Sequence, residues 1–459
     1  MNRSIAVIAF AFATLKIEAQ PYCPSRCPFL SYDEARVVLE AYPTALPPSL
    51  GKSVDPSRWS QWVESEDRAI RQRLDQGEED TLSNLLRFGV TFTREYRLTD
   101  DYLPKYGNST LVNSFADNRA KDLIAALGSP SSGAGIREMR EFIESKGYSV
   151  RTPAERDRLK QYLLRNLARL RDDFLKAHSA EAKQNRSHAF EQRGISLDTN
   201  LWPDYDLDVH LKRMIDAGLL QKHSVHRVAV VGPGLDFVNK VEGLDLYPPQ
   251  TIQPFAVMDS LIRLGLSDLS SIEVYTLDIS ARVNLLLQNA RRSAASGQPS
   301  VIQLPWRSAG RWTDEVRRGF TAYWNKLGDQ IGTPVRPATV PEDLPGVEIR
   351  AVQVKPDAVA RVHPLDLNVV FQRVGPELKF DLIIGTNVFL YYNEFEQSLA
   401  RVNLAAMLAR AGYLLSNDEL PERVPADLAL ALKTELPLTP EPVITELLFS
   451  YARTLDGRE

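Results

Sequence analysis

The chain has 459 residues, of which 44% are hydrophobic and 25% charged, as is ordinary for a globular protein of two or three domains. Its 55 basic and 59 acidic residues give a net charge of −4, so there is no electrostatic signal for nucleic-acid binding. No window approaches the roughly 18 apolar residues that a membrane-spanning helix needs. Composition therefore gives no sign of a nucleic-acid partner, or of a transmembrane span beyond the N-terminal segment.

Residues 1–19 have the layout of a secretory signal peptide. Arg3 supplies a positive charge, residues 5–15 are almost all apolar, and the small residue Ala19 precedes Gln20. We expect cleavage after Ala19 and export of the chain to the periplasm or out of the cell. The alternatives are an uncleaved anchor or a misassigned start, and the alternative localisation is cytoplasmic.

Cys23 and Cys27 lie just past the expected cleavage site and are the only cysteines. In an exported chain we expect this pair to close a small disulfide loop, with two free thiols as the alternative. Two thiols without a nearby histidine are too few for structural zinc, and no third cysteine completes an iron–sulfur set. The sequence therefore predicts no metal site.

Residues 20–225 are expected to form a mostly α-helical N-terminal region. Apolar residues recur at near-helical spacing over 59–74. Thr152 and Glu155 predict a capping box, with a proline at the first helical position, that opens a long helix. The many arginines and lysines of that helix are expected to face solvent, with an acidic partner as the alternative. No motif assigns a function to this region.

Residues 226–459 change to strands alternating with helices. We expect strands at 226–232, 272–279, 300–305, 347–354, 379–386 and 411–416, and helices near 251–265, 280–294, 312–328 and 394–410. This alternation predicts an α/β domain with a parallel sheet covered on both faces. Residues 426–453 are expected to add an antiparallel pair at the sheet edge. Asn393 and Glu396 predict a capping box for the last helix, with Gly412 just past its end.

The most informative motif is the run from Val228 to Phe237, in which a buried strand enters a turn that contains Gly232 and Gly234. Glycine lets the backbone turn tightly and lets a ligand approach it closely. Asp278 ends the next strong strand, where a carboxylate can accept hydrogen bonds from a ribose diol. The combination indicates a nucleoside cofactor on an open α/β sheet.

A dinucleotide cofactor would require G-x-G-x-x-G followed by an acidic residue about 20 residues later. Here Phe237 stands at the third glycine position, and Asp278 follows Gly234 by 44 residues. A nucleotide-dependent oxidoreductase is therefore the least favoured alternative.

A second motif lies at 380–393, Phe-Asp-Leu-Ile-Ile-Gly-Thr-Asn-Val-Phe-Leu-Tyr-Tyr-Asn, followed by a helix and by Ala-Gly-Tyr-Leu-Leu at 411–415. This order resembles the class I S-adenosylmethionine-dependent methyltransferases, and in particular the CheR-type methyltransferases. The resemblance covers 226–420 in motif order, and only 380–415 closely. It implies a Rossmann-like methyltransferase sheet, mostly parallel with an antiparallel edge strand, and S-adenosyl-L-methionine as cofactor.

The resemblance also implies a cofactor site. Gly232 and Gly234 would face the methionine and ribose part, Asp278 would hold the ribose hydroxyls, and Ile279 would pack on adenine. A merely structural turn for the two glycines, and a strand-end cap for Asp278, are the alternatives.

Further along the chain, the resemblance implies that Asp366 accepts a hydrogen bond from the adenine amino group and that Asn387 lines the floor near the sulfonium. Tyr391 and Tyr392 are candidates to position a nucleophile, and His363 is a candidate general base. Their alternatives are packing for the tyrosines and ordinary loop positions for Asp366 and His363.

The function predicted from these motifs is S-adenosylmethionine-dependent methyl transfer to an oxygen or nitrogen of an unknown acceptor, a small molecule or a protein. Thr386 replaces the arginine that usually precedes Asn-Val in CheR-type enzymes, which makes receptor glutamates doubtful acceptors. Export would separate the chain from cytosolic S-adenosylmethionine. An exported non-catalytic binding or scaffold protein on a methyltransferase-like fold is therefore the alternative.

Overall fold

A computed structural model describes residues 27–454, apart from 44–45, 52, 131–132, 178–189, 191–192, 237–244, 308–311, 343, 345, 425–427 and 442. The expected signal peptide, Cys23 and Phe237 lie outside the described residues. Cys27 is described and takes part in a disulfide. Within the described ranges, no helix is long and apolar enough to cross a membrane.

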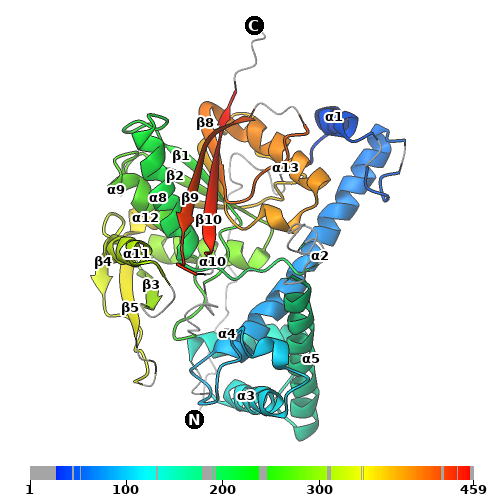
Figure 1. Cartoon of the computed structure of the whole chain (residues 1–459), viewed down its shortest axis with the longest axis vertical. Coiled ribbons are helices and arrows are strands. Elements are labelled where there is room, and N and C mark those ends of the chain that lie inside the picture. Colours follow the sequence, from blue (N-terminus) through cyan, green and yellow to red (C-terminus); the bar gives the residue numbers. More distant parts are fainter. Residues whose placement is uncertain are drawn as a thin grey trace, which may run out of the picture.

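A seven-stranded sheet forms the centre of the α/β domain (Figure 1). Its order is β6-β2-β1-β7-β8-β10-β9, or 3-2-1-4-5-7-6 when only these strands are counted along the chain. The strands from β6 to β8 pair in parallel, and β10 runs antiparallel to both of its neighbours. Their bounds are β1 (Arg227–Val231), β2 (Glu273–Asp278), β6 (Val362–Asp366), β7 (Phe380–Gly385), β8 (Leu408–Ser416), β9 (Leu428–Pro437) and β10 (Thr445–Arg453).

This sheet confirms the predicted α/β fold class, a mostly parallel Rossmann-like sheet with an antiparallel strand near one edge. The reversed strand β10 lies one place in from the edge, which β9 forms. From β1 the chain continues to β2 and β6 on one side, and later to β7 and β8 on the other. The strand order therefore reverses between β1 and β7, and ligands of open α/β sheets bind outside the carboxyl ends of the strands at such a point.

Burial of both faces explains the apolar runs of the central strands. In β1, Val228 and Val230 belong to the apolar cluster on one face, whereas Ala229 and Val231 belong to the cluster on the other face. Successive side chains of a strand point to opposite faces, so a strand covered on both sides has no polar positions. The helices of this half are α8 (Trp202–Asp216), α9 (Gln253–Arg263), α10 (Ala281–Ala295), α11 (Asp314–Lys326), α12 (Pro356–Ala360), α13 (Glu394–Met407) and the 3₁₀ turn η2 (Phe389–Tyr391).

Two of the predicted strands do not belong to the parallel sheet. They are β3 (Ser300–Arg307) and β5 (Val347–Val354), which pair antiparallel and, with β4 (Gly332–Val335), form a separate three-stranded sheet. Expecting them in the main sheet was wrong, because a strand pattern does not reveal its pairing partner. The third parallel strand is instead β6, which the sequence analysis missed because His363 and Pro364 interrupt its apolar pattern.

The predicted capping boxes are present. Asn393 accepts from the backbone N–H of Glu396, whose side chain accepts from the N–H of Asn393. Thr152 and Glu155 make the same pair of contacts at the start of α5. The placement of Gly412 just past the last helix was wrong, because α13 ends at Met407 and Gly412 lies inside β8.

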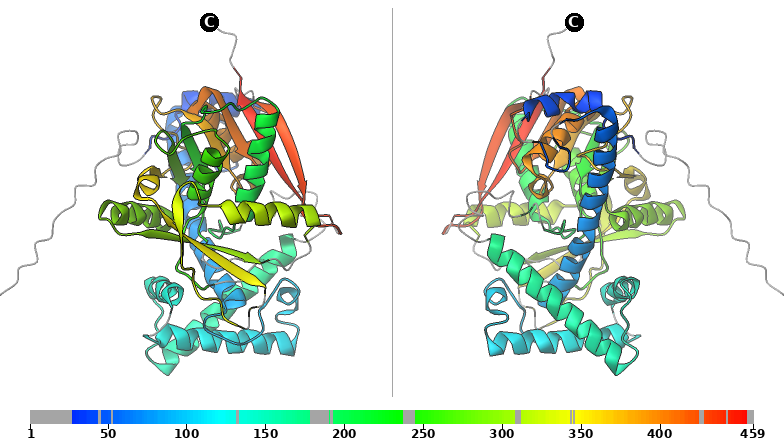
Figure 2. Two further views of the ribbon diagram at one scale, coloured as in Figure 1. Left: turned by 90° about the vertical axis from the view of Figure 1, so that its left-hand side faces the viewer. Right: turned by 90° about the vertical axis from the view of Figure 1, so that its right-hand side faces the viewer.

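The N-terminal region contains α1 (Tyr32–Ala41), α2 (Pro56–Phe88), η1 (Leu103–Lys105), α3 (Thr110–Gly128), α4 (Ala134–Ser145) and α5 (Pro153–Ala177). The long helix α2 takes part in two cores: Trp59, Trp62 and Ile70 pack with the sheet, whereas Leu82 and Leu85 pack with α3, α4 and α5. Figures 1 and 2 show α2 running from the α/β half to this smaller helical bundle. The helix thereby brings residues of the N-terminal region against the sheet.

Candidate functional site

The turn after β1 requires glycine at two positions. Gly232 and Gly234 have φ angles of +59° and +69°, which residues with a side chain rarely adopt. A Cβ on Gly232 would lie 3.0 Å from Cγ2 of Val388, and one on Gly234 would lie 2.8 Å from the carbonyl oxygen of Leu197. The Leu197 carbonyl also accepts from the N–H of Leu235, at 2.6 Å. The chain itself therefore fills the space above Gly234.

A crevice opens at the carboxyl ends of β1, β2 and β7, the edge of the sheet at which the strand order reverses. It contains about 520 Å³ of space free of protein atoms, part of which is open to solvent. Its walls are mostly apolar. They consist of Leu74, Ile195, Ser196, Leu197, Val231, Gly232, Gly234, Leu277, Asp278, Ile279, Leu367, Val369, Asn387, Val388, Tyr391 and Tyr392.

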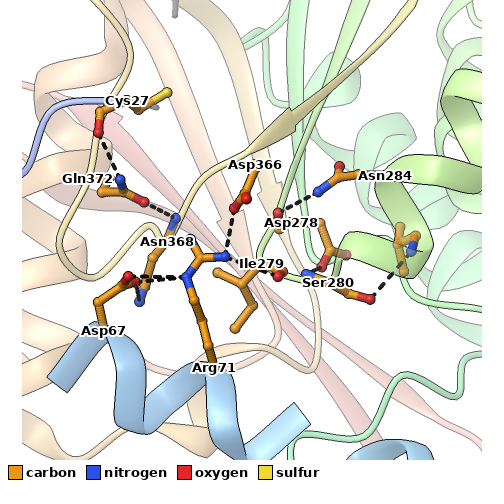
Figure 3. A network of polar contacts seen from close by, with 11 residues as sticks. Cys27, Asp67, Arg71, Asp278, Ile279, Ser280, Asn284, Asp366, Asn368 and Gln372 are labelled. Atoms are coloured by element: carbon orange, nitrogen blue, oxygen red, sulfur yellow. Dashed lines mark hydrogen bonds and ion pairs between the residues drawn. The ribbon is translucent and has the colours of Figure 1, made fainter. Parts of the chain in front are cut away.

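Asp278 is the acidic residue in this wall, and its side chain is almost completely buried. Its Oδ1 accepts from the N–H of Ser280 at 2.7 Å, and its backbone carbonyl accepts from Nδ2 of Asn284 at 2.9 Å (Figure 3). Burial raises the pKa of Asp278 to about 7, and the N–H of Ser280 opposes that rise. A ligand that donates hydrogen bonds, such as a ribose diol, would favour its ionised form.

Asn387 lines the crevice on the side opposite Asp278, and its backbone adopts an unusual conformation. Its φ is +58°, which costs about 1–2 kcal/mol for a residue with a side chain. Asn417, which follows β8, stabilises it: Oδ1 of Asn417 accepts from the N–H of Asn387 at 2.7 Å, and Nδ2 donates to Oδ1 of Asn387 at 2.8 Å. Asparagine is among the residues that tolerate this conformation best, and it places a polar amide at the crevice edge.

Tyr391 and Tyr392 both line the crevice. Burial raises the pKa of both hydroxyl groups above the ordinary value of 10. Both side chains therefore stay protonated at neutral pH, so they can donate or accept a hydrogen bond but cannot serve as a base. The ring of Tyr391 also packs edge-on against Phe190, with centroids 6.0 Å apart.

Two of the candidate residues do not line the crevice. Asp366 ends β6 beside Asp278 in the sheet register, but its carboxylate forms an ion pair with Arg71 at 2.7 Å. His363 lies toward the amino end of β6, where Nε2 contacts Glu273 at 2.6 Å and the ring stacks on Tyr275. The structure thus brings seven of the candidate residues together in the crevice wall, and neither Asp366 nor His363 is part of that wall. The seven are Gly232, Gly234, Asp278, Ile279, Asn387, Tyr391 and Tyr392.

Sequence reasoning missed the part of the wall that comes from the N-terminal region. Leu74 projects from α2, and Ile195, Ser196 and Leu197 lie in the segment that runs beside Leu235. Leu74 belongs to the apolar periodicity noted at 59–74, but periodicity identifies only a buried face and not what covers it. No local pattern marks residues 195–197. Among the described residues, no group of three or more His, Cys, Asp or Glu could hold a metal ion.

Comparisons with protein-family models and with curated proteins give no match. Several solved structures are similar to part of the chain. A magnesium protoporphyrin IX methyltransferase from Synechocystis with bound S-adenosylmethionine is 12% identical over 55% of this chain and 79% of that chain, with a TM-score of 0.26. The N-methyltransferase NodS from Bradyrhizobium japonicum with S-adenosylhomocysteine is 10% identical over 58% and 96%, with a TM-score of 0.28.

A TehB-like S-adenosylmethionine-dependent methyltransferase from Corynebacterium glutamicum is also similar, at 12% identity over 60% of this chain and 96% of that chain, with a TM-score of 0.26. Similarity at this level transfers no ligand and no activity. Any cofactor of this chain therefore has to be inferred from the crevice itself.

Proposed function

We propose that the crevice binds S-adenosylmethionine and that the chain transfers its methyl group to an oxygen or nitrogen of an acceptor. The observation that carries this proposal is the position of Asp278. A buried carboxylate ends β2, faces the crevice, and lies across from a turn in which two glycines adopt positive φ. The carboxyl ends of the strands are where an open α/β sheet binds a nucleoside, and a carboxylate at the end of β2 can accept hydrogen bonds from its ribose diol.

The other walls suit the remaining parts of this cofactor. Ile279, Leu367 and Val369 offer an apolar surface for a purine ring at one end of the crevice. Asn387, Tyr391 and Ser196 offer polar groups at the other side. The residues present therefore fit an adenosine, whose base is flat and apolar on its faces and whose sugar donates hydrogen bonds.

When bound, the sulfonium supplies a methyl group that is already activated for displacement. The acceptor lone pair forms the new bond to carbon while the carbon–sulfur electrons return to sulfur, and the acceptor proton leaves to solvent or a base. Because both tyrosines stay protonated at neutral pH, they can orient the acceptor through hydrogen bonds but would not take its proton. Alignment alone can contribute several kcal/mol of rate enhancement.

Calorimetry with S-adenosylmethionine and S-adenosylhomocysteine, up to millimolar ligand, tests the proposal. We expect saturable binding of one ligand per chain. Leu74→Trp should abolish it, because the larger ring fills the crevice from α2. Leu285→Trp is the matched control, since Leu285 is 51% exposed on α10 and away from the crevice wall. Failure of both ligands to bind the wild-type chain would contradict the proposal.

A second candidate function, an exported non-catalytic binding protein, is favoured by the signal-peptide layout and by the disulfide at Cys27, which suits an oxidising compartment. An exported chain would lack access to cytosolic S-adenosylmethionine. Mass spectrometry of the N-terminus in separated cell fractions distinguishes the two functions. A chain that begins at Gln20 outside the cytosol favours binding without catalysis, and an intact Met1 in the cytosol favours methyl transfer.

We also propose that the chain is related to the CheR-type methyltransferases, which the order of motifs over 380–415 supports. The side chain of Thr386, which replaces their usual arginine, accepts from Nε2 of Gln253 at 3.0 Å and is buried. It therefore offers no cation to a carboxylate acceptor. We propose an acceptor other than a receptor glutamate.

A further inference from the structure

A polar network joins helix α2 to the end of the crevice where Ile279 and Leu367 lie. Its centre is Arg71, three residues before Leu74 and so on the same face of the helix. Nε of Arg71 donates to both carboxylate oxygens of Asp67, at 3.2 and 3.1 Å. Nη1 contacts Oδ1 of Asp366 at 2.7 Å and donates to the carbonyl of Ile279 at 3.2 Å (Figure 3).

The surrounding contacts hold the guanidinium of Arg71 in one orientation. The side chain of Asp67 is completely buried, and its Oδ1 also accepts from Nδ2 of Asn368 at 2.9 Å. The N–H of Asn368 donates to Oε1 of Gln372, whose Nε2 donates to the carbonyl of Cys27 at 2.8 Å. A buried network in which each group is hydrogen-bonded fixes the geometry of its members.

One edge of the Arg71–Asp366 pair stays available to a ligand. Arginine has five N–H donors, and the contacts above use those on Nε and Nη1. Within the part of the chain that the structure describes, no hydrogen bond is made by Nη2 of Arg71 or by Oδ2 of Asp366. The Asp366 side chain is 60% exposed and that of Arg71 is 23% exposed. The pair therefore presents a donor and an acceptor side by side.

The position of the pair matches the far end of a bound adenosine. Asp278 and Asp366 are register partners on neighbouring parallel strands, which lie about 4.8 Å apart. A ribose held at Asp278 would direct its base past Ile279 and Leu367 toward the pair. The six-membered ring of adenine then points toward the pair, because N1 and the N6 amino group lie on the side of the base away from the sugar.

We propose that Arg71 is a specificity-determining residue that donates from Nη2 to N1 of adenine, beside the contact between Asp366 and the N6 amino group that the methyltransferase resemblance already implies. This inference rests on the proposed function. The complementarity is direct, because this edge of adenine offers one acceptor and one donor side by side, and the ion pair offers one donor and one acceptor. A base with a 6-oxo group would present an acceptor to the carboxylate and lose that contact.

Calorimetry on the wild-type chain tests the proposal with three ligands: S-adenosylhomocysteine and its 1-deaza and 7-deaza analogues. Each analogue replaces one ring nitrogen by C–H and keeps the amino group. We expect the 1-deaza analogue to bind about tenfold more weakly or worse, since a hydrogen bond to a charged donor is lost. The 7-deaza analogue should bind within about twofold of the parent, because it keeps N1.

Substitutions complete the cycle. Arg71→Met should weaken binding of S-adenosylhomocysteine to a similar extent. It should also bind the 1-deaza analogue as well as the parent, so that the effects of the substitution and of the analogue on affinity are not additive. Arg68→Met is the control, because Arg68 lies on the exposed side of α2 and donates to the carbonyl of Glu64 in its own helix. Arg71→Lys keeps a cation beside buried Asp67 if the methionine variant fails to fold, and it should still bind less tightly.

Three results would overturn the assignment. Equal binding of the parent and the 1-deaza analogue by the wild-type chain would exclude a contact at N1. Weaker binding of the 7-deaza analogue instead would show that the protein donates a hydrogen bond to N7 rather than to N1. Tighter binding by Arg71→Met would show that the arginine competes with adenine. Failure of the wild-type chain to bind S-adenosylhomocysteine at all would instead overturn the proposed function, and this inference with it.

Discussion

The substitution Asp278→Asn should gain stability relative to the wild type as the pH rises, and it should weaken binding of the proposed ligand. The pKa of Asp278 is raised from 3.8 to about 7, mainly by burial. Between these two values the folded chain keeps a proton that the unfolded chain releases, so stability falls as the pH rises. Above about pH 7 this stabilisation is lost, because the buried carboxyl is ionised. Asparagine does not titrate and avoids that cost.

The magnitude follows from the pKa. From pH 5 to about pH 7 the wild-type chain loses about 1.36 kcal/mol per pH unit through this group, or about 3 kcal/mol in total. The free energy of unfolding of Asp278→Asn, relative to the wild type, should therefore rise by about 3 kcal/mol between pH 5 and pH 8. Urea unfolding at the two pH values measures this difference, and the constant effect of the substitution cancels.

The affinity of the wild-type chain for its ligand should rise with pH, whereas its stability falls. A ribose diol donates to the ionised carboxylate, so wild-type affinity for S-adenosylhomocysteine should rise from pH 5 to pH 8. Asp278→Asn should bind about tenfold more weakly at pH 8, since charge-assisted hydrogen bonds are lost.

Asp236→Asn is the matched control for both effects. Burial also raises the pKa of Asp236 to about 7, but this residue does not line the crevice. It should show the same pH-dependent gain in stability with unchanged affinity. The reasoning would be refuted if Asp278→Asn gained no relative stability at pH 8, or if it bound the ligand as tightly as the wild type.

Two further predictions concern local structure, and urea unfolding checks each of them. Gly232→Ala should lower the free energy of unfolding by about 1–2 kcal/mol for the positive φ, and by more because the new methyl group meets Val388. Gly147→Ala has a similar φ but open space around the methyl group, so it should show only the cost of the positive φ. Equal costs for the two variants would contradict the close approach of Val388 to Gly232. Asn393→Ala should cost about 1 kcal/mol by removing the cap of α13, whereas Asn393→Asp, which keeps an acceptor, should be close to neutral; a large loss with aspartate would contradict the capping role.

The sequence predicted the parts of the site whose chemistry is local. The apolar run of β1, the glycine turn and the acid at the end of β2 lie within short segments, and each is recognisable from residue type and order. Residue order also located Asn387, because the strand before it and the capped helix after it both carry clear patterns. The parallel sheet then brings these strand ends together without further information.

Other features depend on contacts between distant parts of the chain. Because α2 packs along the sheet, Leu74 lines the crevice and Arg71 contacts the carbonyl of Ile279 beside it. An amphipathic pattern does not say which surface covers it. Pairing of β3 with β5 rather than with the main sheet is likewise decided by their partners. Strand β6 is short and carries a histidine and a proline, so tertiary pairing rather than propensity makes it a strand.

A crystal structure of the chain with S-adenosylhomocysteine tests the central claim most directly. It should show the ligand in the crevice, both ribose hydroxyls within hydrogen-bond distance of the Asp278 carboxylate, and the adenine edge toward Arg71 and Asp366. A ligand bound elsewhere, or a crevice that stays empty at saturating ligand concentration, would contradict the account.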